Sequence, residues 1–354
     1  MVKILKHTSL LFLFLFNTSV KGQNNLDTLE TYSLGKCHLK NEQVIEDCKI
    51  SFRTIGRLAP DKNNIMIVPS WLGGTSQDFI SSGYVGSGKM ADSDKYYIII
   101  IEAFGSGNSS SPSNSKTQGN EKFPYFSIED IVDAQYNLIN KHLGFNHVNA
   151  FLGISLGASQ TYHWMTKYPK FMDQAIIITG TPQPSSSDKL SYRLAIDAVA
   201  GLLKLNDNGL SARNFIIRFE THMAWTKEWF SQNVNTGDYI LFEQKKLNET
   251  RLNPYDYKAQ TTALLNGDIS EIDNGDLSIT AKRFKIPFLT FYHERDGYIN
   301  PNPSIKLSKL KGQPLVKLDG HCGHYAPDCE INRITRRIHK FLSIETNRGL
   351  INSY

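Results

Sequence analysis

The chain has 354 residues, 21% of them charged, and a formal net charge of +5 at neutral pH. This length suits one large domain or a domain with an insertion, and the composition is ordinary for a globular protein. Residues 1–22 hold three lysines and no acid, so the remainder carries only +5 − 3 = +2, and no Lys/Arg run clusters anywhere. These numbers exclude a nucleic-acid-binding protein, which needs a clustered basic face.

Residues 1–22 have the three parts of a secretory signal peptide. Lys3 and Lys6 precede a short apolar run, Leu10 to Phe16, and Val20 and Gly22 stand at the cleavage positions. The run is too short to span a bilayer comfortably, so we expect cleavage and a secreted or periplasmic protein, with an uncleaved anchor as the alternative. No other stretch is apolar enough to cross a membrane, and no stable membrane span is expected after cleavage.

Four cysteines in a chain expected to be exported favour disulfides over free thiols. Cys37 and Cys48 flank two short expected strands, and cross-strand pairing would bring them together. Cys322 and Cys329 lie seven residues apart near the C-terminus. Four cysteines allow three pairings, of which the local one, 37–48 with 322–329, is the simplest.

Expected strands and helices alternate along the chain from residue 65 onward. A capping-box pattern, Ser127 with Asp130, starts the first helix. Apolar β-branched runs separated by helices indicate a mostly parallel sheet covered on both faces, an α/β fold. The expected strands are 65–68, 96–101, 147–154, 175–179, 285–292 and 314–319, and the expected helices are 127–144, 155–168 and 330–343.

The alternation breaks at 180–189 and gives way to a polar, helix-like segment. We therefore predict one discontinuous core, 30–180 with 281–345, and an inserted helical cap or lid at 181–280. Trp225 and Trp229 lie one helical turn apart within the cap. They form either a structural stripe or an apolar lid over a site.

Residues 83–90 match the G-x-x-x-x-G-K pattern of a phosphate-binding loop but end in Met90, where Ser or Thr is needed for magnesium. A strand, not a helix, is expected to follow. We reject nucleotide binding and predict no cofactor.

Gly153-Ile-Ser155-Leu-Gly157 is a G-x-S-x-G sequence between an expected strand and an expected helix. In that context a tight turn raises the Ser155 hydroxyl above the sheet, and the helix N-terminus favours a developing anion. The alternative is that this motif is an ordinary glycine-rich turn without a catalytic role. The context favours a serine nucleophile.

A serine nucleophile needs a base and an acid that orients the base, in the order Ser, acid, His. Asp296 follows the strand expected at 285–292, with Glu294 as the alternative acid. His324 and His321 follow the strand expected at 314–319. Two successive strand ends therefore supply the acid and the base.

Catalysis by an acyl-serine also needs two backbone N–H donors for the oxyanion. Leu156, directly after the nucleophile, is one. The loop after 65–68 supplies the other, with Trp71 preferred and Leu72 as second choice.

The C-terminal histidines and cysteines could instead be metal ligands. His321 and His324 interleave with Cys322 and Cys329, which is not the usual spacing of zinc ligands. Oxidised cysteines are not metal ligands either, so we predict no metal site and a disulfide that restrains the loop carrying His324.

The chain resembles the homoserine O-acetyltransferase family of α/β-hydrolase-fold proteins, and its hydrolase-like members most of all. The resemblance implies Ser155 as nucleophile, Asp296 as acid and His324, in a Gly-His pair, as base. Leu156 and Ala158 depart from the G-x-S-M-G-G of the transferases, and no arginine is identified to hold a homoserine carboxylate. The segments that carry the resemblance are 69–79, 86–100, 104–114, 123–139, 153–169 and 322–327.

Three functions follow for comparison. The first is an exported serine enzyme that hydrolyses a small-molecule acyl ester or amide through an acyl-serine, as a monomer or homodimer. The second is a homoserine or serine O-acetyltransferase, which needs the acetyl-CoA of the cytoplasm. The third is a non-catalytic binding module on a hydrolase scaffold. The order of Ser155, Asp296 and His324 argues against the third, and water as the available acceptor outside the cell favours the first.

Overall fold

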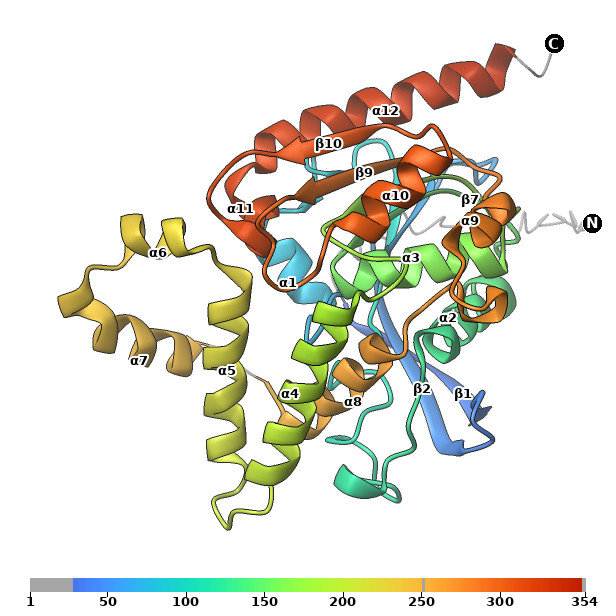
Figure 1. Cartoon of the computed structure of the whole chain (residues 1–354). Helices are drawn as coiled ribbons and strands as arrows, with labels where there is room; N and C mark the ends of the chain where they lie inside the picture. The colour runs from blue at the N-terminus through green and yellow to red at the C-terminus, as the bar shows by residue number, and fades with distance from the viewer. Residues whose placement is uncertain (1–27, 250–251, 352–354) are drawn as a thin grey trace, which may run out of the picture.

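A computed structural model describes residues 28–249 and 252–351, so the predicted signal peptide lies outside the described residues. Its centre is an eight-stranded sheet in the order β1-β2-β6-β3-β7-β8-β9-β10 (Figure 1). Neighbours from β6 to β10 are parallel, whereas β1 and β2 are antiparallel. The mostly parallel α/β fold is therefore confirmed. The strands of this sheet are β1 (Glu30–His38), β2 (Val44–Ile55), β3 (Ile65–Pro69), β6 (Tyr97–Ile101), β7 (Val148–Ile154), β8 (Met172–Ile178), β9 (Phe288–His293) and β10 (Leu315–Leu318).

The central strands are buried on both faces because successive side chains point to opposite sides of a sheet. Along β7, Phe151 packs into the apolar core on one face and Leu152 into the core on the other. Ile177 and Ile178 of β8 divide in the same way. A continuous β-branched run is thus the sequence signature of a strand with no solvent-facing side.

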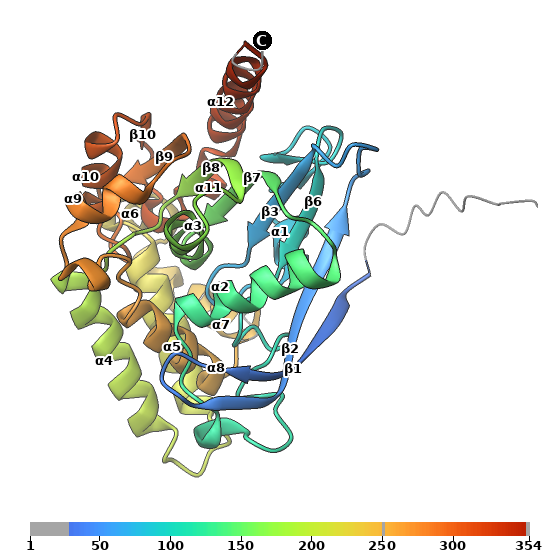
Figure 2. The same cartoon turned by 90° about the vertical axis from the view of Figure 1, so that its right-hand side faces the viewer.

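Helices cover both faces of the sheet, as the turned view in Figure 2 shows. Tyr162 and Leu307 bring their helices, α3 and α10, to one core, while Phe79 and Ile334 bring α1 and α12 to the other. The helices packed on the sheet are α1 (Ser76–Ser81), α2 (Ile128–Tyr136), α3 (Leu156–Lys167), α10 (Asn302–Leu310) and α12 (Ile331–Ile351).

The helix expected at 127–144 begins as predicted but changes its winding. Ser127 accepts a hydrogen bond from the Asp130 N–H, which completes the capping box. The α-helix ends at Tyr136 and continues as a π-helix, Asn137–His142. The apolar periodicity that predicts a helix does not distinguish these windings over so short a stretch.

Between β8 and β9 the chain forms a set of helices, of which α5, α6 and α7 project away from the sheet (Figure 1). A small apolar core joins three of them, with Val199, Ile216 and Tyr257 among its members. The division into a core of 30–180 with 281–345 and a cap of 181–280 stays a prediction. The helices here are α4 (Ser186–Leu202), α5 (Leu210–Ala224), α6 (Lys227–Asn233), α7 (Tyr239–Glu249), α8 (Pro254–Leu265) and α9 (Leu277–Thr280).

Short elements complete the fold. Residues 83–90 lead through the small strand pair β4 and β5 into β6, not into a helix, so this segment lacks the context of a phosphate-binding loop. In the described ranges, no helix combines the length and the apolar character that crossing a membrane requires. The short elements are β4 (Val85–Gly86), β5 (Ala91–Asp92), α11 (Ala326–Cys329) and the 3-10 turns Asn120–Lys122, Thr236–Asp238, Glu271–Asp273, Ala281–Arg283 and Gly323–Tyr325.

Candidate active site

Ser155 occupies a strained turn between β7 and α3. Its φ is 55° and its ψ −122°, a left-handed backbone that a non-glycine residue rarely adopts. A Cβ on Gly153 would lie 2.4 Å from the Gly157 carbonyl oxygen, and one on Gly157 would lie 2.3 Å from that of Pro69. Only glycine fits at both flanks, which explains the G-x-S-x-G pattern.

His324 and Asp296 converge on this serine from the loops that follow β10 and β9. The His324 Nε2 atom lies 2.9 Å from Ser155 Oγ, and His324 Nδ1 lies 2.8 Å from Asp296 Oδ2. The other carboxyl oxygen of Asp296 accepts the N–H groups of Tyr298 and Ile299, both at 2.9 Å. Asp296 is thereby held in the orientation that faces the imidazole.

The protonation of His324 reflects two opposed effects. Burial disfavours the imidazolium, but the adjacent Asp296 carboxylate outweighs burial and raises the pKa of His324 above its ordinary value. An imidazolium formed by proton uptake from Ser155 would therefore be stabilised where it stands.

The two alternative residues lie elsewhere. His321 is exposed, and its Nδ1 lies 3.1 Å from a guanidinium nitrogen of Arg295. Glu294 forms an ion pair with Lys317 at 2.6 Å. Neither side chain takes part in the contacts around Ser155 that the structure describes.

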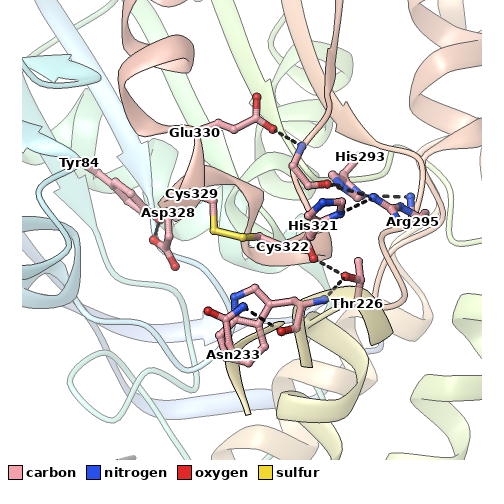
Figure 3. Close-up of a disulfide and its surroundings, with 12 residues drawn as sticks. Tyr84, Thr226, Asn233, His293, Arg295, His321, Cys322, Asp328, Cys329 and Glu330 are labelled. Atoms are coloured by element: carbon pink, nitrogen blue, oxygen red, sulfur yellow. Dashed lines mark hydrogen bonds between the residues drawn. A yellow bond between two sulfur atoms is a disulfide. The ribbon is translucent and has the colours of Figure 1, made fainter. Parts of the chain in front are cut away.

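The loop that carries His324 is tied down by several contacts (Figure 3). A disulfide joins Cys322 to Cys329, with 6.5 Å between their Cα atoms, so neither sulfur is a thiolate available to a metal. The Thr226 hydroxyl, directly before α6, donates a hydrogen bond to the His321 carbonyl oxygen. Gly320 N–H donates to a carboxyl oxygen of Glu330 at 3.0 Å. These contacts restrain the loop that holds the His324 imidazole.

The second cysteine pair lies far along the chain from this loop. Cys37 of β1 and Cys48 of β2 form a disulfide with 5.6 Å between their Cα atoms. It cross-links the two antiparallel strands at the edge of the sheet.

The loop after β3 lines the same pocket as Ser155. The Gly73 N–H donates to Gln260 Oε1 at 2.7 Å, and the Gly74 N–H donates to the Trp71 carbonyl at 3.0 Å. Within the described chain, the N–H groups of Trp71 and Leu72 donate to no protein acceptor. Both residues line the pocket over Ser155, so the structure leaves both as candidate oxyanion donors.

Leu156 begins α3 directly after Ser155, which puts its N–H at a helix N-terminus. Gln160, one turn later, donates hydrogen bonds to the carbonyls of Leu156 at 3.2 Å and Ser70 at 2.8 Å. This buried amide joins the two segments from which the oxyanion donors are expected.

A cavity of about 190 Å³ opens above Ser155. It is small compared with the sites of drug-sized ligands, which span roughly 300–1,000 Å³. Its wall contains one tryptophan, three tyrosines and two carboxyl groups. The residues that line it are Trp71, Leu72, Ser82, Tyr84, Ile154, Ser155, Glu220, Tyr298, His324, Tyr325, Pro327 and Asp328.

Comparison with known proteins shows which family the chain belongs to. Residues 63–328 match the model of the alpha/beta hydrolase fold family. The chain belongs to the α/β-hydrolase family. It is 28% identical over 333 residues to an ethyl acetate hydrolase of Pseudomonas veronii, covering 87% of this chain and 93% of the relative. A probable esterase of Corynebacterium glutamicum is 30% identical over 318 residues, with 83% and 89% covered.

The homoserine O-acetyltransferase resemblance also holds in this α/β hydrolase. The enzyme of that name from Geotalea uraniireducens is 31% identical over 185 residues, which is 48% of each chain. Among solved structures, an acetylester hydrolase from Corynebacterium glutamicum superposes with a TM-score of 0.79 at 24% identity, covering 88% of this chain and 96% of that one. The protein is therefore a homoserine O-acetyltransferase-like α/β hydrolase and an enzyme of the serine hydrolase and acyltransferase type.

Two pocket residues of this α/β hydrolase escaped sequence reasoning. Glu220 comes from α5 and Tyr298 from the loop after Asp296. In the sequence, a single acid on a polar helix is typical of a solvent-exposed residue. Only the structure shows that Glu220 of α5 lines the pocket. Tyr298 could have been predicted, because it lies only two residues after the expected acid, Asp296.

Proposed function

We propose that this protein is an exported ester hydrolase that acts on small acyl esters through an acyl-enzyme on Ser155. The observation that carries the proposal is the pair of contacts at His324, 2.9 Å to Ser155 Oγ and 2.8 Å to Asp296. Nucleophile, base and orienting acid within hydrogen-bond reach are what acyl transfer by a serine requires.

In the first half of the reaction, Ser155 Oγ attacks the ester carbonyl carbon while its proton moves to His324 Nε2. The N–H groups of Leu156 and Trp71 stabilise the oxyanion of the tetrahedral intermediate, with Leu72 as the alternative to Trp71. His324 then gives its proton to the departing alcohol, and the acyl group stays on Ser155.

In the second half, a water molecule loses a proton to His324 and attacks the acyl-serine carbonyl. Collapse of this intermediate releases the carboxylic acid and returns the proton to Ser155. The cavity of about 190 Å³ favours short acyl chains, and the relatives named for hydrolysis of ethyl acetate and for esterase activity support the same substrate class.

Export is the second part of the proposal. The signal-peptide pattern of residues 1–22 and the two disulfides together favour an oxidising compartment. We propose further that residues 181–280 act as a cap over the site, since Glu220 of α5 lines the pocket. Recovery of a cytoplasmic protein that retains Met1 would refute export.

The decisive experiment uses purified wild type and Ser155→Ala. We expect the wild type to react with a fluorophosphonate at Ser155 and to hydrolyse p-nitrophenyl acetate and ethyl acetate, and the variant to do neither. Labelling is read by peptide mass spectrometry, and circular dichroism confirms that the variant folds. An unlabelled wild type that cleaves no ester would leave a non-catalytic module.

Acetyl transfer is the alternative, favoured by the match to a homoserine O-acetyltransferase across 48% of the chain. The same preparation is given acetyl-CoA with L-homoserine or L-serine, and O-acetylated product is measured by mass spectrometry. Transfer faster than hydrolysis would replace the hydrolase proposal, while the role of Ser155 would stand.

A further inference from the structure

The pocket over Ser155 combines aromatic walls with negative charge. Trp71, Tyr84, Tyr298 and Tyr325 contribute rings, and Glu220 is one of two carboxyl groups at its wall. No lysine or arginine appears among the described residues that line it. Aromatic faces with a carboxylate form the surroundings that an organic cation prefers.

Glu220 has a neighbour but no counter-ion. One of its carboxyl oxygens accepts a hydrogen bond from the Tyr257 hydroxyl at 2.5 Å. No ion pair to Glu220 occurs within residues 28–249 and 252–351. Burial raises the pKa of Glu220 to about 7, against the opposite effects of the Tyr257 and Tyr298 hydroxyls and of His324. A half-buried carboxyl group without a cation is destabilised when it ionises, and a bound cation would relieve this.

The Tyr298 hydroxyl is a second polar group of the pocket, and it interacts with Glu220. Tyr298 is only 3% exposed, and its hydroxyl forms no well-aligned hydrogen bond with a described residue, although it lies within interaction range of the Glu220 carboxylate. Burial and, after it, the nearby Glu220 carboxylate raise the pKa of Tyr298 well above its ordinary value. A buried hydroxyl without a partner is costly, so such groups in a pocket wall commonly face a ligand.

The position of these groups identifies which part of a substrate they face. The Tyr298 ring lies 5.1 Å from the His324 ring, centre to centre. His324 delivers its proton to the leaving alcohol, whereas the carbonyl oxygen turns toward Trp71 and Leu156. Tyr298 and the adjacent Glu220 therefore lie on the alcohol side of the scissile bond.

The geometry points to a cation subsite formed by Glu220 and Tyr298, which selects esters whose alcohol part carries a small ammonium group. This inference rests on the proposed ester hydrolysis and names its substrate class. Glu220 and Tyr298 are then specificity-determining residues, and they take no part in proton transfer.

Acetylcholine and 3,3-dimethylbutyl acetate test this subsite because they have the same shape and differ only in charge. At pH 8, where Glu220 is ionised, we expect wild type to prefer acetylcholine by about tenfold in kcat/KM. Glu220→Gln should bring the ratio of the two kcat/KM values close to one. Glu228→Gln, which removes an exposed acid paired with Arg295 at 3.0 Å, is the matched control and should leave the ratio unchanged.

A second measurement needs no variant. Tetramethylammonium chloride should inhibit wild-type hydrolysis of 3,3-dimethylbutyl acetate competitively, compared with sodium chloride at the same ionic strength. Equal rates on the two esters, a ratio unaffected by Glu220→Gln, or no specific inhibition would each overturn the cation subsite while ester hydrolysis stands. If wild type cleaves neither these esters nor p-nitrophenyl acetate, the proposed hydrolase function itself fails.

Discussion

At the scale of single residues, substitution can distinguish Asp296, the proposed acid, from the nearby Glu294. Asp296→Asn keeps the shape of the side chain but removes the charge that favours the imidazolium and the correct tautomer of His324. By analogy with the serine proteases, kcat should fall about 10⁴-fold. The measurement is steady-state hydrolysis of p-nitrophenyl acetate.

Glu294→Gln provides the control for this comparison. Glu294 lies two residues away and pairs with Lys317 on the surface, so its loss should change kcat less than twofold. A large effect at Glu294 and a small one at Asp296 would reassign the acid.

The pH dependence of the reaction follows from the raised pKa of His324. Only neutral His324 accepts the serine proton, so kcat/KM should fall as pH decreases through the pKa of the free enzyme. Burial acts to lower this pKa, but the carboxylates of Asp296, Glu220 and Asp188 all act to raise it. We expect the acid limb above the ordinary value of about 6.5. Initial rates from pH 5 to 9 check this, and a midpoint at or below 6.5 would contradict it.

The sequence contains the proposed catalytic residues in a readable form because each follows a strand. Ser155, Asp296 and His324 stand at the carboxyl ends of β7, β9 and β10, and parallel strands bring those ends to one edge of the sheet. The choice between Trp71 and Leu72 stayed open because it depends on loop geometry. Glu220 was not predictable, since no periodicity in a polar helix tells which side chain reaches over the core.

At the scale of elements, the Cys322–Cys329 disulfide should matter for activity more than for folding. It closes a short loop that carries His324, so its removal should loosen the base without releasing the main core. For the Cys322→Ser/Cys329→Ser variant we expect kcat to fall about tenfold or more, since small displacements of catalytic groups are costly.

The other disulfide supplies the comparison. Cys37→Ser/Cys48→Ser removes a cross-link at the sheet edge and should lower the unfolding free energy by about 2 kcal/mol with little change in kcat. Hydrolysis rates and urea unfolding measure the two effects. Similar losses of kcat in both variants would mean that the disulfides act only through general stability.

At the scale of the whole molecule, Glu220 of α5 carries a stability cost that is tied to the proposed specificity. The folded-state pKa of Glu220, about 7, lies above the ordinary 4.5. The folded protein therefore binds more protons than the unfolded chain between these values, and stability falls as pH rises through this window. This pKa difference corresponds to at most about 3 kcal/mol, and partial exposure of the side chain reduces the cost to about 1–2 kcal/mol.

Glu220→Gln should remove that cost and so stabilise the protein at pH 8 but not at pH 4.5, where the glutamate is protonated when folded. The measurement is urea unfolding of wild type and variant at both pH values. His163 provides an internal reference: burial lowers its pKa to about 4, so it lowers stability as pH falls below 6.5 in both proteins alike. A gain of the same size at both pH values would show that Glu220 acts through packing and not through its charge. A gain confined to pH 8, together with loss of the preference for acetylcholine, would mean that this α/β hydrolase retains a destabilising carboxylate because a cationic substrate needs it.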